Sequence, residues 1–405
     1  MQAVRQTCDV RGPINAPTRA RNHQNKNSIQ AMRMNSVLET DPTGIEETLS
    51  TWNIPPKPHS RQIPGESANA VYWSWACRKL EVMPRLPLED SASAAPEPGD
   101  LALVRVDKIG FHKYLTTTEN RRLRLYPGAQ FIGVFGNRYA SDAYEAEVQG
   151  TGKLSLLTGA GMIGTVKSKH EGMAEPTQIS FVGFVRATEG RRLNLKSRLF
   201  RPATARQIPR NLIFIVGASM NSGKTTTAAR LTKGLSELGL RVAACKLTGS
   251  VSNQDTDELE AAAARKVTDF SDFGFPSTYL CGKEELLELF YAMMTEVRTG
   301  APDMVVMELA DGLLQRETAM LLAEPEMQRA ARGVVFTGES ALSALWGAER
   351  LSSLGYRVVA VSGKFTSSPL AMREYTEHDS HIPVVSSAGT GEELAVRVKS
   401  FLSGQ

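Results

Sequence analysis

The C-terminal half of the chain alternates short apolar runs with longer segments of helical periodicity. Apolar runs of five or six residues are typical of buried strands, and the segments between them place apolar residues three and four apart, as amphipathic helices do. This alternation predicts a parallel sheet covered by helices on both faces, with ligands at the carboxyl ends of the strands. The predicted strands are 211–216, 241–246, 303–308 and 357–362, and the predicted helices are 224–238, 256–267, 283–298 and 340–354.

Residues 100–200 show a different pattern, in which short alternating or apolar runs are separated by turn residues such as Pro127-Gly128 and Glu189-Gly190. Closely spaced short strands without helical periodicity predict a small all-β domain, either an antiparallel barrel or a sandwich. The predicted strands are 101–106, 122–125, 130–135 and 179–185.

The part of the chain before residue 100 has little periodicity. Residues 1–68 are rich in Asn, Pro, Ser and Arg, which predicts a disordered tail. For the Arg-rich, acid-poor start at 1–35, a plain tail, a start codon placed too early and an organelle-targeting peptide are the alternatives. Residues 69–99 hold an aromatic segment at 71–76, for which we expect a short helix, and a linker. An α/β domain is expected at 208–405.

Composition excludes some classes of protein. The chain has 405 residues, of which 41% are apolar, and a formal charge of +4. No run of 18 apolar residues occurs, so no membrane span is predicted. The small charge and the lack of interleaved aromatic and basic residues in 100–200 make nucleic acid an improbable partner. The four cysteines are scattered without CxxC pairing, which favours a cytoplasmic protein over a disulfide framework or a zinc site.

The strongest motif is a loop of small residues that follows the apolar run 212–216 and ends in Gly-Lys-Thr, where a helix begins. Such a loop cradles phosphates with backbone N–H groups, while its lysine supplies a cation and its threonine hydroxyl reaches Mg²⁺. The slot usually held by the first glycine contains Ala218, with Gly217 just before it. The predicted nucleotide-binding residues are Gly217, Ala218, Ser219, Asn221, Ser222, Gly223, Lys224, Thr225 and Thr226.

Four charged residues lie at the ends of other predicted strands or in the loop between them. Lys246 ends the strand 241–246, where it could neutralise charge during phosphoryl transfer, although a solvated lysine is the alternative. Glu308 ends the strand 303–308, the usual place of a carboxylate that holds Mg²⁺. Asp255 and Asp257 lie in the loop between them and are either magnesium ligands or caps of the next helix. We predict Lys224 and Lys246 as catalytic and Thr225, Asp255 and Glu308 as metal ligands.

The phosphate loop is followed along the chain by Lys-x-Thr-Gly at 246–249, then by an aspartate, and then by Glu-x-Ala-x-Gly-Leu-Leu at 308–314. This order of motifs resembles that of dethiobiotin synthetase. The resemblance extends to its relatives among the dimeric P-loop NTPases, namely the ATP domains of cobyric and cobyrinic acid synthases and the molybdopterin-guanine dinucleotide helper. It covers roughly residues 211–365. The chain departs from the synthetase at Leu247, where that family has proline, and at Asp311-Gly312, where it has two glycines.

The resemblance implies an enzyme that uses ATP and Mg²⁺ to phosphorylate a small acid or amine-derived carbamate, and a possible homodimer. It assigns the loop lysine and threonine to Lys224 and Thr225, the second lysine to Lys246, and the acidic ligands to Asp255 or Asp257 and to Glu308. The alternative is a nucleotide-switch ATPase that assists a partner protein or a cofactor-biosynthesis enzyme. A guanine-reading Asn-Lys-x-Asp is absent from the sequence, which favours ATP over GTP.

Four further residues are weaker candidates. Lys364 and Thr366 follow the last predicted strand and could line a base or substrate pocket, although capping of the next helix at Ser368-Pro369 explains part of that segment. Arg138 in the β domain could hold a carboxylate or phosphate, or could form a structural ion pair with Asp142. His170 is predicted to be a surface residue.

Overall fold

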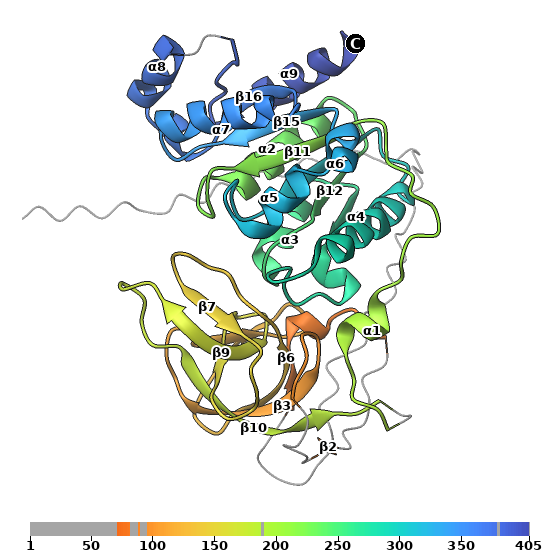
Figure 1. Cartoon of the computed structure of the whole chain (residues 1–405), viewed down its shortest axis with the longest axis vertical. Helices are drawn as coiled ribbons and strands as arrows, with labels where there is room; N and C mark the ends of the chain where they lie inside the picture. The colour runs from red at the N-terminus through yellow and green to blue at the C-terminus, as the bar shows by residue number, and fades with distance from the viewer. Residues whose placement is uncertain (1–70, 82–87, 90–94, 188–189, 379–380, 405) are drawn as a thin grey trace, which may run out of the picture. The chain divides into compact units, whose positions relative to one another are not determined.

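The computed structural model describes residues 71–81, 88–89, 95–187, 190–378 and 381–404, all of which belong to one compact unit of the chain (Figure 1). The tail predicted at 1–68 lies outside the described residues. Within these ranges, no helix combines the length and the apolar character that crossing a membrane requires.

Five of the first ten described strands close into a barrel, while β4 and β5 form a separate two-stranded sheet. Neighbours β6, β3, β10, β8 and β9 form a closed ring, because β9 pairs with β6 as well as with β8. The predicted all-β fold is therefore confirmed as a barrel, in which most pairings are antiparallel but β6 pairs with β9 in parallel. The strands are β1 (Val71–Trp73), β2 (Leu88–Glu89), β3 (Leu101–Lys108), β4 (Tyr114–Thr116), β5 (Arg122–Arg124), β6 (Gln130–Phe135), β7 (Tyr144–Glu147), β8 (Leu154–Leu156), β9 (Met162–Lys169) and β10 (Thr177–Val185).

The aromatic segment before the linker does not form the expected helix. Its first residues, Val71–Trp73, form β1, which pairs in parallel with β6, and only Trp75–Cys77 form a single 3₁₀ turn. β-Branched and aromatic side chains pack well on a pleated surface. Residues 71–73 are therefore a strand because they pair with the edge of β6, which lies more than fifty residues away in the sequence.

The C-terminal half holds a six-stranded, wholly parallel sheet in the order β13-β12-β14-β11-β15-β16. This confirms the predicted α/β fold. The strands are β11 (Leu212–Gly217), β12 (Val242–Lys246), β13 (Lys266–Asp269), β14 (Met304–Leu309), β15 (Gly333–Thr337) and β16 (Val358–Ser362). The helices are α1 (Leu195–Leu199), α2 (Lys224–Glu237), α3 (Asn253–Ala261), α4 (Lys283–Arg298), α5 (Arg316–Leu322), α6 (Pro325–Ala330), α7 (Ala341–Ser353), α8 (Pro369–His378) and α9 (Glu392–Ser403).

Helices cover both faces of this sheet, and each face has its own apolar core (Figure 1). The α2, α3 and α9 helices pack on one face, against Ile215 and Val306 among others. The α4, α5, α6 and α7 helices pack on the other face, against Phe214 and Met307. Alternation along β11 and β14 thus sends successive side chains to opposite cores.

Two parts of the sheet differ from the prediction. The helix predicted at 256–267 is wrong in its second half, because α3 ends at Ala261 and the edge strand β13 begins at Lys266. The alanine-rich stretch between them favours helix, but Ala263 has a left-handed φ of 61°, which ends it. Strand β15 was not predicted, although its apolar residues 334–336 provide the signal for a buried strand.

Polar contacts connect the barrel to the sheet. The Arg78 guanidinium donates to the Ser271 hydroxyl at 2.9 Å and to the Asp269 carboxylate at 3.2 Å, and it also pairs with Asp272. Asn120 on the barrel donates to the Asp257 carboxylate at 2.9 Å. Val251, from the loop after β12, is buried in one of the barrel's apolar cores.

Candidate functional site

The loop 218–223 leaves the carboxyl end of β11 and leads into α2. The Ala218 N–H donates to the Thr337 carbonyl at 2.9 Å, and the Ser222 hydroxyl lies 2.8 Å from the Thr337 hydroxyl. Gly223 has a φ of 97°, which favours glycine. A Cβ on Gly217 would lie 2.1 Å from Ser222 Oγ. Close packing therefore requires glycine at position 217.

The Lys224 side chain is 3% exposed and folds back over the loop. Its Nζ donates to the carbonyl oxygens of Ser219 at 2.6 Å, Met220 at 3.3 Å and Asp311. Burial lowers the pKa of Lys224, and the carboxylates of Glu308 and Asp311 oppose this shift. The ammonium thus lies at the concave side of the loop, where phosphate oxygens bind in loops of this kind.

Strand register brings Lys246 and Glu308 together. These residues are direct partners in the parallel pair of β12 and β14, and Ile215 of β11 is the next partner in the row. Partners in adjacent strands point to the same face, which here is the face covered by α2. Glu308 therefore meets Thr225, the second residue of that helix, with 3.3 Å between Thr225 Oγ1 and Glu308 Oε1.

A compact charged cluster results at the start of α2. Lys246 Nζ lies 2.9 Å from Asp255 Oδ2 and 3.3 Å from Glu308 Oε1, and Thr225 Oγ1 lies 3.5 Å from Asp255 Oδ1. Burial by itself lowers the pKa of Lys246, but the Asp255 and Glu308 carboxylates together raise it above its ordinary value. At neutral pH Lys246 is therefore charged, and the solvated lysine considered as the alternative is not what the structure contains.

The donor set of this cluster fits a magnesium ion. Glu308 is 1% exposed, and its Oε2 atom is buried without a hydrogen-bond partner. Mg²⁺ prefers oxygen ligands and is held in nucleotide sites by one or two carboxylates together with substrate phosphates. The described residues contain no group of three or more His, Cys, Asp or Glu side chains placed to hold a metal. The oxygen atoms that this cluster could offer to a metal ion are those of the Asp255 and Glu308 carboxylates and the Thr225 hydroxyl.

The two acidic candidates on α3 point in different directions. Asp255 faces Lys246 and Thr225, whereas Asp257 accepts from Asn120 of the barrel and from Asn253, both at 2.9 Å. Ser252, rather than either aspartate, caps the helix, since its hydroxyl accepts from the Gln254 N–H. Asp255 is therefore the acid of the cluster.

Asp311 borders the same cluster without entering it. Burial raises the pKa of its carboxyl to about 6, although Lys246 and Lys224 act to lower it. The next residue, Gly312, packs directly on the phosphate loop, because a Cβ there would lie 2.5 Å from the Ala218 carbonyl oxygen. The loop 310–312 therefore forms a wall of the site.

The remaining predicted loop residues have their own contacts. Ser219 donates to Glu339 at the start of α7, and Asn221 Nδ2 donates to Asp142 Oδ2 of the barrel at 2.8 Å. Thr226 lies beside Glu258 of α3 and acts to lower the pKa of that carboxyl. The tip of the phosphate loop thus contacts the barrel as well as the sheet.

The weaker candidates separate clearly. Thr366 is buried and its hydroxyl hydrogen-bonds to the Ser387 hydroxyl at 2.9 Å, so its role is structural. The Lys364 N–H donates to the Ser222 carbonyl at 2.9 Å, which places its backbone, but not its exposed side chain, against the phosphate loop. His170 is exposed, as predicted. Arg138 and Asp142, the alternative ion pair, lie beyond direct ion-pairing distance, but the Asp142 carboxylate still acts to raise the pKa of Arg138.

Two supporting residues escaped sequence analysis. Thr337, at the end of the unpredicted strand β15, holds both ends of the phosphate loop through Ala218 and Ser222. Gly363 follows β16, and a Cβ there would lie 2.5 Å from the Ser222 carbonyl oxygen. Gly363 could have been found from the sequence, because it directly follows the predicted strand 357–362. Thr337 could have been found only if the strand β15 had been predicted.

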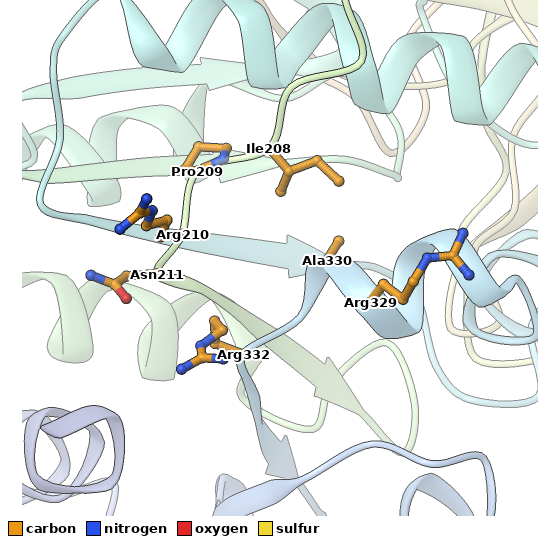
Figure 2. Close-up of a pocket in the computed structure, with 7 residues that line it drawn as sticks. All are labelled: Ile208, Pro209, Arg210, Asn211, Arg329, Ala330 and Arg332. Carbon is orange, nitrogen blue, oxygen red and sulfur yellow. The ribbon is translucent and has the colours of Figure 1, made fainter. Parts of the chain in front are cut away.

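A pocket of about 390 Å³ lies elsewhere, at the amino ends of β11 and β15 (Figure 2). It is lined by Arg210, Arg329 and Arg332 among others. Figure 2 shows the Arg329 guanidinium pointing away from the other two, so the three cations do not converge on one ligand. In parallel sheets ligands bind at the opposite, carboxyl ends of the strands, and this pocket is separate from the charged cluster.

Comparisons with known proteins found likenesses among solved structures only. No family model and no curated protein matches the chain. The signal recognition particle receptor FtsY from Elizabethkingia anophelis is 14% identical, with a TM-score of 0.34 over 52% of this chain and 74% of that one. A LAO/AO transport system kinase is 14% identical, with a TM-score of 0.31 over 48% and 61%. The signal recognition particle 54 kDa protein from Aeropyrum pernix, solved with GDP, is 16% identical, with a TM-score of 0.33 over 52% and 53%.

These likenesses are low, and the chain spans less than two thirds of the length of the last two proteins. The geometry of the chain itself identifies its fold. Three features together define the fold of the C-terminal half. They are a parallel sheet, a loop of small residues that closes over Lys224 after the strand β11, and a helix that begins with Lys-Thr beside Glu308 at the end of β14. The C-terminal half of the chain has the P-loop NTPase fold.

Proposed function

We propose that the protein is a Mg²⁺-dependent ATP-binding enzyme that transfers the γ-phosphoryl group of ATP to a small carboxylate or carbamate. The observation that carries this proposal is the cluster of Thr225, Lys246, Asp255 and Glu308 at the end of the phosphate loop. A loop alone suffices to bind phosphate. A second buried lysine, held beside the loop by two carboxylates, supplies the positive charge that a phosphoryl-transfer site needs to stabilise the transferring group.

Each residue has a distinct task in this proposal. The N–H groups of the loop and Lys224 bind the β- and γ-phosphates. Thr225, Asp255 and Glu308 would hold Mg²⁺, which when bound would neutralise charge on the phosphate oxygens. Lys246 faces the γ-phosphate and stabilises the negative charge that develops on it. An oxygen of the substrate acid forms a bond to the γ-phosphorus while the bond from phosphorus to the β–γ bridging oxygen breaks, which yields an acyl phosphate and ADP.

One contact favours a second function, a nucleotide switch. Asn221 at the tip of the phosphate loop binds Asp142 of the barrel, so a loop that moves with the nucleotide would also move that barrel segment. The two functions differ in what accelerates turnover. The enzyme responds to a small acid, and the switch responds to a protein partner.

The test is calorimetric titration of the full chain with ATP in the presence of Mg²⁺. Lys224→Ala should weaken ATP binding at least tenfold, because the buried ammonium that faces the phosphates is lost. Lys233→Ala is the matched control, since Lys233 lies on the same helix but is exposed and pairs only with Glu237. Equal ATP affinity in the Lys224 variant and the control would refute the proposal. Tighter binding of GTP than ATP would refute the choice of nucleotide.

A further inference from the structure

A cavity of about 630 Å³ is lined in part by Ser250–Gln254, the segment that directly precedes Asp255 of the charged cluster. One wall comes from loops of the barrel, including His112 and Arg138, and the opposite wall is the segment Ser250–Gln254 between β12 and α3. This volume is in the range of pockets that enclose small-molecule ligands. The cavity is thus large enough for a substrate.

The wall of this cavity is basic. Lys113, Arg122 and Arg138 line it together with His112, and none of its described lining residues is an aspartate or glutamate. Lys113 is exposed, and Arg122 stacks its guanidinium 4.1 Å from the centre of the Tyr114 ring. A concave surface with one sign of charge attracts ligands of the opposite sign.

Arg138 is the cation with an unsatisfied hydrogen-bonding group. Its Nε atom is buried and has no hydrogen-bond partner, and no described carboxylate lies within ion-pairing distance of it. Its terminal nitrogen lies 3.4 Å from His112 Nε2. Arg138 is half-buried, and the Asp142 and Asp311 carboxylates act on its pKa from beyond ion-pairing distance. A ligand carboxylate would therefore be the first anion in direct contact with this guanidinium among the described residues.

The charge states at neutral pH support an anionic ligand. Burial and the neighbouring Arg138 lower the pKa of His112 to about 4, so its imidazole is neutral. Burial lowers the pKa of Arg138 to about 10, so its guanidinium stays protonated. The interior of the cavity therefore carries the Arg138 charge, with His112 as a neutral neighbour.

The cavity is connected to the nucleotide site by a single loop. The chain leaves Lys246, passes through the lining residues Ser250–Gln254 and reaches Asp255, so both ends of the lining segment belong to the charged cluster. Arg138 also lies close enough to Asp311 for that carboxylate to act on its pKa. One wall of the cavity is therefore continuous in the chain with Asp255 of the charged cluster.

We propose that this cavity binds a small aliphatic carboxylic acid through an ion pair between a ligand carboxylate and Arg138. The binding of an acid is inferred from the cavity alone, and only the role of this acid as the substrate that ATP activates rests on the proposed function. A guanidinium presents a fork of donors that matches the two oxygens of a carboxylate. The terminal nitrogens of Arg138 supply that fork, since its Nε atom is buried.

The experiment titrates the full chain, without nucleotide, with straight-chain mono- and dicarboxylic acids from acetate to suberate and with their amides. At least one acid should bind while its amide does not. Arg138→Gln should weaken binding of that acid by about tenfold to a hundredfold, the loss expected for hydrogen bonds to a charged group. Arg124→Gln is the matched control, an exposed barrel arginine outside the cavity wall.

Two further variants keep the test decisive. Lys113→Gln, exposed at the cavity wall, cannot disturb a core and should weaken the same acid severalfold even if Arg138→Gln folds poorly. Because the titration contains no nucleotide, acid binding is measured independently of ATP. Binding of acid and amide alike, unchanged affinity in both cavity variants, or no binding across the acid panel would overturn the inference. Acid binding without ATP turnover would refute only the proposed function.

Discussion

Replacing Lys246 with methionine isolates the electrostatics of the charged cluster. Methionine keeps much of the apolar stem of the lysine and removes the ammonium. In the protein, that ammonium lies 2.9 Å from Asp255 Oδ2 and 3.3 Å from Glu308 Oε1. The variant leaves the two carboxylates facing each other with no cation between them.

The expected cost follows from burial. Removing one partner of a buried ion pair destabilises a protein by about 3–5 kcal/mol, because the other charge is left uncompensated. The Glu308 side chain is 1% exposed, but that of Asp255 is 23% exposed. Water therefore reaches one of the two carboxylates, and we expect the lower end, about 3 kcal/mol. Mg²⁺ should restore part of this loss, since it replaces the missing cation.

Urea denaturation with and without Mg²⁺ measures this effect. The pKa of Lys246 is raised in the folded protein, so its stabilisation is complete below the ordinary lysine pKa of about 10.4 and is lost as the pH rises through the folded value. The difference between wild type and variant should therefore be constant from pH 7 to 9. The control is Lys266→Met, whose pair with Glu296 is exposed and should contribute about 1 kcal/mol or less.

The reasoning predicts turnover as well as stability. With Mg²⁺ present, Lys246→Met should still bind ATP but hydrolyse it much more slowly, because the variant lacks the ammonium that stabilises the transferring phosphoryl group. A variant as stable as wild type in the absence of Mg²⁺, or one that Mg²⁺ does not stabilise more than it stabilises wild type, would refute the electrostatic account. Unchanged turnover would remove Lys246 from the mechanism.

Two other predictions concern the loop 310–312. Burial raises the pKa of Asp311 to about 6, so its contribution to stability is complete below about pH 4 and is lost as the pH rises through 6. Urea denaturation at pH 4 and pH 7.5 should show this loss as a fall of about 3 kcal/mol in the wild type and not in Asp311→Asn. Equal falls in the two proteins would contradict the prediction. Gly312→Ala places a Cβ 2.5 Å from the Ala218 carbonyl oxygen, so ATP affinity measured by calorimetry should fall at least tenfold, whereas Gly239→Ala, where the space is open, tests the general cost of losing a glycine; normal ATP binding by Gly312→Ala would show that the wall does not shape the loop.

Sequence alone identified the phosphate loop, because its chemistry depends on local residues. Gly223, Lys224 and Thr225 are adjacent in the chain, and a strand before and a helix after them are enough to define their task. Lys246 and Glu308 were predicted for a similar reason, since each directly ends an apolar run. The prediction of Asp255 rather than Asp257 had no physical ground in the sequence, because both lie in one helical turn and only the packing of α3 separates them.

The local pattern of the chain determined the elements and most of the charged site, since the carboxyl ends of parallel strands meet at one edge wherever such strands occur. The tertiary structure decided what depends on partners distant in sequence. It placed Val71–Trp73 in a strand through β6, made β13 an edge strand where alanines favour helix, and closed the barrel through β6 and β9. It also placed Arg138 opposite the loop after β12, because side chains more than a hundred residues apart come together only when the whole chain has packed.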